Sequence, residues 1–231
     1  MINEKFWKNK KVLITGHTGF KGRWLSILLE TLGAKTFGLS LNNKKNYKQL
    51  EYINFLSKKK SYNVDIRNKN DINKVITKIS PEIIIHMAAQ SKVIDSLNFP
   101  VETFETNFMG TVNILNVSVK LRKVKTILII TTDKVYENTN KTKKFSENDK
   151  LGGDDPYSAS KASTEIILNY YKKYFPEKKI ISVRAGNIIG GGDFSKNRII
   201  PDIIRSIINK NNLVIRNKEH TRPWLFILDT L

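Results

Sequence analysis

The sequence of 231 residues predicts an α/β fold built on a doubly wound parallel β-sheet. Short apolar runs alternate along the chain with segments in which apolar residues recur at helical spacing, and this alternation is typical of repeated β-α-β units. The runs 83–85 and 127–130 are apolar at every position, as is expected of strands that helices cover on both faces. A glycine-rich turn joins the first expected strand to the first expected helix.

The elements expected in the first part of the chain are short apolar strands separated by amphipathic helices. The strands are expected, in chain order, over residues 11–15, 36–41, 62–64, 82–88, 126–131 and 179–184. The helices between them are expected over residues 20–32, 47–56, 71–79, 100–121 and 156–175. Gly33 and Pro81 end the first and the third of these helices. Further along, the pattern predicts a helix over 201–209 and a strand over 213–216.

The composition excludes several classes of protein. Hydrophobic residues make up 40% of the chain and aromatic residues 10%, far from the composition of a disordered or fibrous protein. Without cysteine there are no disulfides and no thiolate metal sites, and we expect no metal. The N-terminus carries charges where a signal peptide needs its apolar stretch, and no apolar run is long enough to span a bilayer. We therefore expect a cytoplasmic location.

The net charge of +19 raises the question of a nucleic-acid or membrane partner. The lysines are scattered through the loops and helix faces rather than gathered into one stripe. We therefore expect neither partner and interpret the lysines as solvated surface residues. A positive field can still speed the capture of an anionic substrate.

The segment between the first strand and the first helix has the spacing of a dinucleotide site. Gly16, Gly19 and Gly22 lie three residues apart, where glycine lets backbone N–H groups approach a pyrophosphate and the helix N-terminus favours negative charge. The alternative is only a tight connection between strand and helix. The position directly after a buried strand and before an amphipathic helix favours the dinucleotide site. We therefore expect a Rossmann-type domain over 1–190.

The sequence leaves the choice between NAD and NADP open. The acid that usually binds the adenosine ribose is missing after the second expected strand. Ser40 or Asn42 could donate to a ribose hydroxyl, whereas Lys44 and Lys45 could contact a 2′-phosphate.

Asp65 and Ile66 follow the third expected strand, in a position suited to the adenine amino group and the adjacent backbone. An alternative of equal weight is that Asp65 caps the following helix.

Tyr157 and Lys161 stand four residues apart at the start of the helix expected over 156–175, and so share one face of it. A nearby cation lowers the pKa of tyrosine, so the phenolate can take a proton from a sugar hydroxyl as a hydride leaves for a nicotinamide. The alternative is a surface pair that arises by chance. The preceding Thr132, at the carboxyl end of the strongest strand, favours catalysis because open α/β sheets bind their ligands at that edge.

Taken together, these motifs resemble those of the extended short-chain dehydrogenases/reductases, the family of NAD-dependent epimerases and dehydratases. The resemblance covers nearly the whole chain and is carried by Gly16/Gly19/Gly22, His86–Gln90, Asn107–Thr111, Thr132–Lys134 and Tyr157/Lys161. It implies that Thr132, Tyr157 and Lys161 form a catalytic triad. It also implies a nucleotide-sugar substrate and a homodimer or larger assembly.

The same resemblance implies which residues bind NAD and the sugar nucleotide. The cofactor residues would be Gly16, Thr18, Gly19, Phe20, Lys21, Gly22, Asp65, Ile66, Ala88, Ala89, Gln90, Asn107, Tyr157, Lys161, Ala185 and Asn187. The substrate residues would be Asn187, Arg198 and Arg222. Core packing is the alternative for Ala88 and Ala89. The resemblance makes Asn107 a structural or proton-relay residue, and a hydrogen bond within the helix is the alternative.

Longer segments resemble the CDP-glucose 4,6-dehydratases within that family, which act in deoxysugar synthesis for bacterial O-antigens. These segments are Thr15–Ser26, Arg184–Asp193, Arg198–Arg205 and Arg222–Trp224. After Thr132 the chain has Asp133 and Lys134, where the related TDP-glucose dehydratases have Asp-Glu. The sequence departs from the group in the adenosine-ribose segment and at Ser91–Asp95. Because the chain stops at Leu231 in an apolar stretch, we expect 191–231 to be the start of an incomplete substrate-binding portion.

The reaction implied by the resemblance is redox-neutral. Tyr157 would take the proton of the C4 hydroxyl while NAD takes the hydride, Lys134 would remove the C5 proton, and Asp133 would protonate the leaving C6 hydroxyl. An ammonium beside Asp133 would lower the pKa of that acid, so Lys134 would have to be neutral or Asp133 desolvated. Alternatives are another nucleotide-sugar dehydratase, a 4-epimerase, a noncatalytic NAD-binding or basic nucleic-acid-binding protein, and an inactive fragment.

Overall fold

The structure is a computed structural model that describes residues 3–41, 60–137, 144–215, 219 and 221–231. The helix expected over 47–56, and the residues Asn42, Lys44 and Lys45, lie outside the described residues. The chain divides into two compact units, Met1–Ala185 and Gly186–Leu231, and each is described by itself.

A six-stranded sheet with the order β3-β2-β1-β4-β5-β6 forms the centre of the first unit, and every described pair of its neighbouring strands is parallel. The strands are β1 Lys11–Thr15, β2 Lys35–Ser40, β3 Ser61–Asn63, β4 Ile83–His86, β5 Thr126–Thr132 and β6 Lys179–Ala185. The chain order reverses between β1 and β4, which are hydrogen-bonded neighbours. The doubly wound parallel sheet predicted from the sequence is confirmed.

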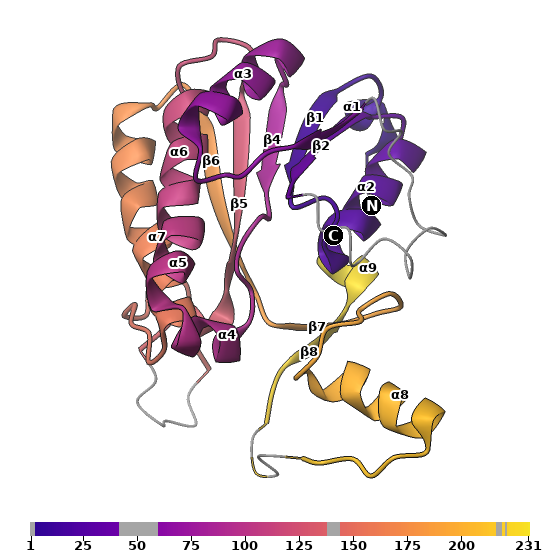
Figure 1. Cartoon of the computed structure of the whole chain (residues 1–231). Helices are drawn as coiled ribbons and strands as arrows, with labels where there is room; N and C mark the ends of the chain where they lie inside the picture. Colours follow the sequence, from indigo (N-terminus) through magenta and orange to yellow (C-terminus); the bar gives the residue numbers. More distant parts are fainter. Residues whose placement is uncertain (1–2, 42–59, 138–143, 216–218, 220) are drawn as a thin grey trace. The chain divides into compact units, whose positions relative to one another are not determined.

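Helices cover both faces of this sheet, with α2 on one face and α3, α6 and α7 on the other (Figure 1). The helices of the first unit are α1 Glu4–Trp7, α2 Phe20–Thr31, α3 Lys69–Ile79, α4 Val93–Asn98, α5 Pro100–Phe104, α6 Gly110–Ser118 and α7 Pro156–Tyr174. A 3₁₀ turn over Asp133–Val135 follows β5. None of the described helices is long and apolar enough to cross a membrane.

The single helix expected over 100–121 is interrupted. Between α5 and α6, residues Glu105–Met109 form a π-helical turn, which holds one residue more than an α-turn. Apolar spacing does not reveal this interruption, because the residues on either side of it remain helical. The short helices α1 and α4 were not expected either.

The hydrophobic core of the first unit lies beneath the helices of the second face. Leu13, Ile84, Ile127 and Ile180 stand side by side on four neighbouring strands, and each is buried. They belong to one cluster with buried side chains of α3, α6 and α7, among them Ile72, Ile76, Ile114, Leu115 and Leu168. Fully burying one such side chain contributes about 1.5–3 kcal/mol.

The second unit contains β7 Asn187–Ile189, α8 Ile199–Asn209, β8 Trp224–Phe226 and α9 Ile227–Thr230. The helix expected over 201–209 is confirmed as α8. The strand expected over 213–216 is wrong, since 213–215 are neither strand nor helix and Val214 is 81% exposed. The strands that do form, β7 and β8, are parallel partners of each other, and 213–215 have no neighbouring strand in the described chain.

Candidate functional site

The turn after β1 needs glycine because of its backbone geometry. Gly16 has φ = +71°, and a Cβ atom there would lie 2.8 Å from the backbone nitrogen of Ala88. A Cβ atom on Gly22 would lie 2.3 Å from the carbonyl oxygen of Gly16. Gly19 is the N-cap of α2, and no side chain caps this helix start. The turn therefore connects β1 to α2, packs against the backbone that follows β4, and leads into a helix N-terminus that no side chain caps, which suits a pyrophosphate.

The other expected cofactor residues of the first unit lie at or near the carboxyl edge of the sheet. Those in the turn and the first turn of α2 are Thr18, Phe20 and Lys21. Those in the segment after β4, beyond Met87, are Ala88, Ala89 and Gln90. Ala185, the last residue of β6, pairs in register with Thr132, the last residue of β5. Ala88 also packs against the hydrophobic core, so the packing role considered for it is present.

A buried hydrogen-bonded chain connects β1, β4 and α6. Thr15 Oγ1 lies 2.7 Å from His86 Nδ1, and His86 Nε2 lies 3.0 Å from Thr111 Oγ1. The two backbone N–H groups that follow His86 both donate to Thr15 Oγ1 at 3.1 Å. Burial, and then the charge of Lys161, lower the pKa of His86 to about 3. A neutral imidazole therefore fixes the backbone after β4.

Asn107 lies in the π-helical turn and is fully buried. Its side-chain amide donates to the carbonyl oxygen of Gln90 and to the hydroxyl of Ser160, each at 3.0 Å. Its Oδ1 accepts from the N–H of Gln90 at 2.8 Å. Asn107 thus ties the segment after β4 to α7, and these three bonds leave its own helix, unlike the bond within the helix considered as the alternative.

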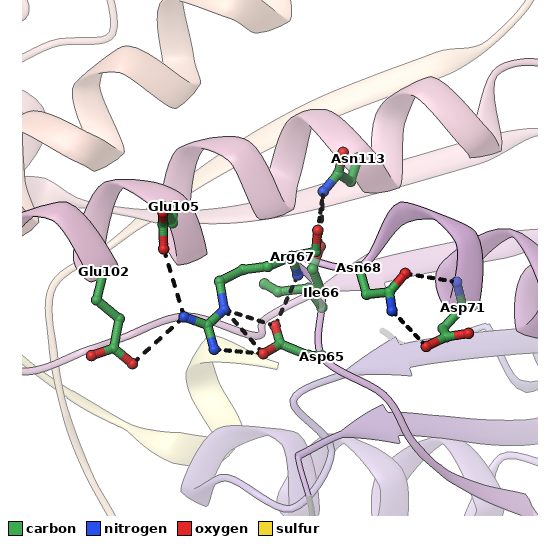
Figure 2. Close-up of polar contacts among 8 residues, drawn as sticks. All are labelled: Asp65, Ile66, Arg67, Asn68, Asp71, Glu102, Glu105 and Asn113. Atoms are coloured by element: carbon green, nitrogen blue, oxygen red, sulfur yellow. Dashed lines mark hydrogen bonds and ion pairs between the residues drawn. The ribbon is translucent and has the colours of Figure 1, made fainter.

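The alternative that Asp65 caps α3 is wrong. The N-cap is Asn68, whose side chain accepts from the N–H groups of Asn70 and Asp71. Ile66 is buried in the core, and its carbonyl oxygen accepts from Asn113 Nδ2 at 3.1 Å. The side chain of Ile66 is thus committed to packing, and the backbone beside it is held by α6 (Figure 2).

The carboxylate of Asp65 is held by Arg67. The guanidinium donates to both carboxylate oxygens, with Nη2 at 2.6 Å from Oδ2 and Nε at 3.1 Å from Oδ1. These hydrogen bonds are the main reason that the pKa of Asp65 is lowered. On its other side Arg67 lies 3.8 Å from Glu102 and 3.7 Å from Glu105 (Figure 2). The fork therefore keeps Asp65 ionised and fixes its orientation.

Tyr157 and Lys161 lie on the first turns of α7, as predicted. Asp155 caps this helix by accepting from the N–H of Ser158. Lys161 is buried, and its Nζ donates to the carbonyl oxygen of Ile130 at 3.0 Å. Burial, and secondarily the charge of Lys21, lower the pKa of Lys161 to about 7. The site thus holds a desolvated lysine that shares a helix with a phenol.

Thr132, Asp133 and Lys134 lie together where β5 ends. Thr132 caps the 3₁₀ turn, and its Oγ1 donates to Asp133 Oδ1 at 3.1 Å. Asp133 and Lys134 are both described by the structure and form no ion pair with each other. The carboxyl and the amine are therefore adjacent in sequence yet separately available.

Sequence reasoning missed two residues next to this site. Glu165 is buried on α7, one turn beyond Lys161, and Arg184 on β6 forms an ion pair with it at 3.2 Å. The spacing of four residues between Lys161 and Glu165 would have placed Glu165 on the catalytic face of the helix. The partner on β6 could be found only from the fold.

Three expected residues belong to the second unit. Asn187 begins β7, and its backbone N–H donates to the carbonyl oxygen of Pro223 at 3.1 Å. Arg198 is the N-cap residue of α8 and forms an ion pair with Asp193 at 3.2 Å. Arg222 donates to the carbonyl oxygen of Thr221 at 3.0 Å. All three lie in the second unit, and their role in binding the substrate stays a prediction.

Comparison with known proteins gives a consistent family. Residues 12–231 match the model of the NAD dependent epimerase/dehydratase family. The chain is 40% identical to a CDP-glucose 4,6-dehydratase of Salmonella typhimurium, over all of this chain and 67% of that protein. It is 31% identical to a dTDP-D-glucose 4,6-dehydratase of Dictyostelium discoideum, over 95% of this chain and 53% of that protein.

Two solved structures share the fold. A UDP-glucose 4-epimerase of Thermotoga maritima has a TM-score of 0.84 at 21% identity, over 95% of this chain and 70% of that one. A dTDP-glucose 4,6-dehydratase of Bacillus anthracis, solved in complex with NAD, has a TM-score of 0.79 at 25% identity, over 95% and 68% of the two chains. These proteins are longer than the chain described above.

Proposed function

The chain belongs to the NAD-dependent epimerase/dehydratase family, and we propose that it acts as a nucleotide-sugar 4,6-dehydratase whose substrate is CDP-glucose. The observation that carries this proposal is the segment Thr132–Lys134 at the end of β5, which adds a carboxyl group and an amine to the Tyr157 and Lys161 of α7. The 40% identity to a CDP-glucose 4,6-dehydratase supports the choice of reaction and of substrate.

The residues of the first unit fit NAD. Gly16 and Gly19 carry no side chains and lie in the turn before a helix start that no side chain caps, where a pyrophosphate can approach backbone N–H groups. The ionised carboxylate of Asp65 can accept from the adenine amino group. Ala88 and Ala89, in the segment after β4, lie where the order of the strands reverses, the position at which open α/β sheets bind dinucleotides.

In the first half of the proposed reaction, the protein supplies a base. NAD, when bound, accepts a hydride from C4 of the sugar and later returns it to C6. Tyr157 accepts the proton of the C4 hydroxyl as the C4–H bond breaks, and a cation at Lys161 favours the phenolate. Thr132 donates a hydrogen bond that orients the hydroxyl. The C4 ketone that results makes the neighbouring C5 proton more acidic.

In the second half, the two residues after Thr132 carry out the elimination. Lys134 accepts the C5 proton in its neutral form, and Asp133 in its acid form donates a proton to the C6 hydroxyl, which leaves as water. A proton at C5 and the returned hydride at C6 complete the product, a 4-keto-6-deoxy sugar. The product differs from the substrate by the loss of one water, and the cofactor ends in its starting oxidation state.

The test is to incubate the full-length protein with NAD and CDP-glucose and to measure the product by mass. We expect a product lighter by one water, formed faster from CDP-glucose than from UDP-glucose or TDP-glucose. A product of unchanged mass but altered configuration at C4 would instead assign a 4-epimerase, the activity of several relatives in this family. Faster turnover of another nucleotide sugar would change the assigned substrate but not the assigned reaction.

A further inference from the structure

One ion pair holds both ends of the segment that carries Asp133 and Lys134. At the near end, Thr131 Oγ1 donates to Glu165 Oε1 at 2.5 Å. At the far end, Arg184 Nη1 donates to the hydroxyl of Tyr136 at 3.0 Å. Since Glu165 and Arg184 lie 3.2 Å apart, the segment 131–136 is fastened at both ends to the same pair of charges.

The pair is well shielded from water. The side chains of Glu165 and Arg184 are 4% and 17% exposed. Burial by itself would raise the pKa of Glu165, but the donors Arg184, Thr131 and Ser182 outweigh burial and lower it. Because the desolvation of a buried ion pair offsets much of its attraction, such a pair contributes little net stability. Its presence is better explained by the geometry that it imposes.

Three elements and a loop meet at this pair. Glu165 is on α7, one turn beyond Lys161, while Arg184 is on β6 opposite Thr131 of β5 in the sheet register. The guanidinium carbon of Arg184 also lies 5.0 Å from the ring centre of Tyr136. That ring stacks on Phe145 at 4.7 Å. Displacement of Arg184 would therefore remove two contacts that hold Tyr136, the residue that follows the 3₁₀ turn.

We propose that Glu165 and Arg184 are positioning residues that fix Asp133 and Lys134 for the elimination step. This inference rests on the proposed dehydratase function. The oxidation step depends less on the pair, because two of its three residues, Tyr157 and Lys161, are held by α7, and Lys161 donates a hydrogen bond to the carbonyl oxygen of Ile130. The side chain of Asp133, in contrast, has a single hydrogen bond within the described part of the chain, and it accepts that bond from Thr132 of its own turn.

The experiment compares two rates in the full-length, NAD-loaded protein. Oxidation at C4 is followed by the absorbance of reduced nicotinamide after CDP-glucose is added, and elimination is followed by the appearance of the lighter product. In Arg184→Met we expect the ratio of elimination to oxidation to fall about 10–100-fold, the effect of misplacing a catalytic group by roughly 1 Å. Tyr136→Phe, which removes one hydrogen bond, should lower the same ratio by less.

Controls separate positioning from general damage. Glu137→Gln removes an exposed ion pair with Lys150 in the same loop and should leave the ratio unchanged. Arg184→Lys keeps the charge and should restore part of the ratio. The double variant Glu165→Gln, Arg184→Met removes both charges together and so avoids leaving one buried and unpaired. It should fold and show the same low ratio.

The proposal is overturned if both rates fall equally, or if the ratio is unchanged in Arg184→Met and the double variant. A parent protein that removes no water from any nucleotide sugar would refute the proposed function instead. In that case amide hydrogen exchange tests whether the clamp, meaning the hold of Glu165 and Arg184 on residues 131–136, exists. Exchange should rise in peptides covering 131–136 of the double variant but not in α3, and an unchanged 131–136 would refute the clamp.

Discussion

The hydroxyl oxygen of Thr15 lies 2.7 Å from Nδ1 of His86, a fully buried imidazole whose tautomer is fixed at its other nitrogen, by Thr111. Thr111 Oγ1 donates to the carbonyl oxygen of Asn107 at 2.6 Å, so it accepts from Nε2–H of His86. Nδ1 then accepts from Thr15. A proton added to Nδ1 would face a hydroxyl whose own proton is directed at it. This geometry agrees with the lowering of the His86 pKa to about 3.

Stability should therefore depend on pH through His86. The unfolded chain binds a proton at this residue below its ordinary pKa of 6.5, whereas the folded chain does so only near 3. The contribution of His86 to the free energy of unfolding is thus fully present well above pH 6.5 and is lost as the pH falls towards 3. Between pH 7 and pH 5 we expect a loss of about 2 kcal/mol from this group. Urea unfolding at both pH values measures it, and His86→Gln should remove most of that difference.

Substitution of the two glycines of the turn should have different effects, mainly on stability at Gly16 and mainly on NAD binding at Gly19. Gly19→Val should cost only about 1 kcal/mol, because its Cβ would meet just one atom, the oxygen of Gly16, at 3.2 Å. It should still weaken NAD binding more than tenfold by blocking the pyrophosphate. Gly16→Val should lower stability by about 1–3 kcal/mol through its contact with Ala88. Calorimetric titration with NAD and thermal melting distinguish the two, and unchanged NAD affinity in Gly19→Val would remove the turn from the site.

Tyr157→Phe should retain NAD and its fold while turnover falls about 10²–10⁴-fold, the usual contribution of a general base. Steady-state assays of water loss, with NAD affinity measured in parallel, provide the test. Tyr170→Phe is the matched control, since Tyr170 is on the same helix and 48% exposed. Comparable rates in the two variants would argue against a base at Tyr157.

Lys134→Ala should leave the oxidation at C4 intact and slow the elimination of water. Oxidation uses Thr132, Tyr157 and Lys161, so addition of CDP-glucose should still give the absorbance of reduced nicotinamide. Water loss should slow by about 10²-fold or more for want of a C5 base, and the absorbance should persist. Rapid mixing followed at the nicotinamide band measures both. Dehydration at the parental rate, or a complete failure to oxidise, would exclude Lys134 as the base.

Arg67→Ala should weaken NAD binding by about tenfold, because the variant loses the fork that orients the Asp65 carboxylate. The readout specific to this role is the preference for NAD over its deaminated analogue, which lacks the adenine amino group. That preference should decline in Arg67→Ala and persist in Glu102→Gln, which leaves the Asp65 contact intact. Equal loss of affinity for both dinucleotides would indicate a general effect on structure.

The features that could be predicted from sequence are those encoded by local pattern. Two examples depend only on the spacing of residues close together in the sequence. They are the strand Lys11–Thr15 with the glycines after it, and the pair Tyr157 and Lys161. The ion pair of Glu165 with Arg184 depends on which strand lies beside β5, and no local pattern contains that information. The mistaken strand over 213–216 has the same origin, because its apolar residues do not reveal that 213–215 have no strand beside them among the described residues.

The π-helical turn at Glu105–Met109 makes the length of this segment as important as its composition. An α-helix rotates by about 100° with each residue, so the extra residue sets the angular phase of everything that follows. With the present phase Thr111 meets His86, and Ile114 and Leu115 enter the core. A chain one residue shorter here would keep every other side chain and yet direct a different face of α6 at the sheet. Relatives should therefore tolerate substitutions in this segment far more readily than insertions or deletions.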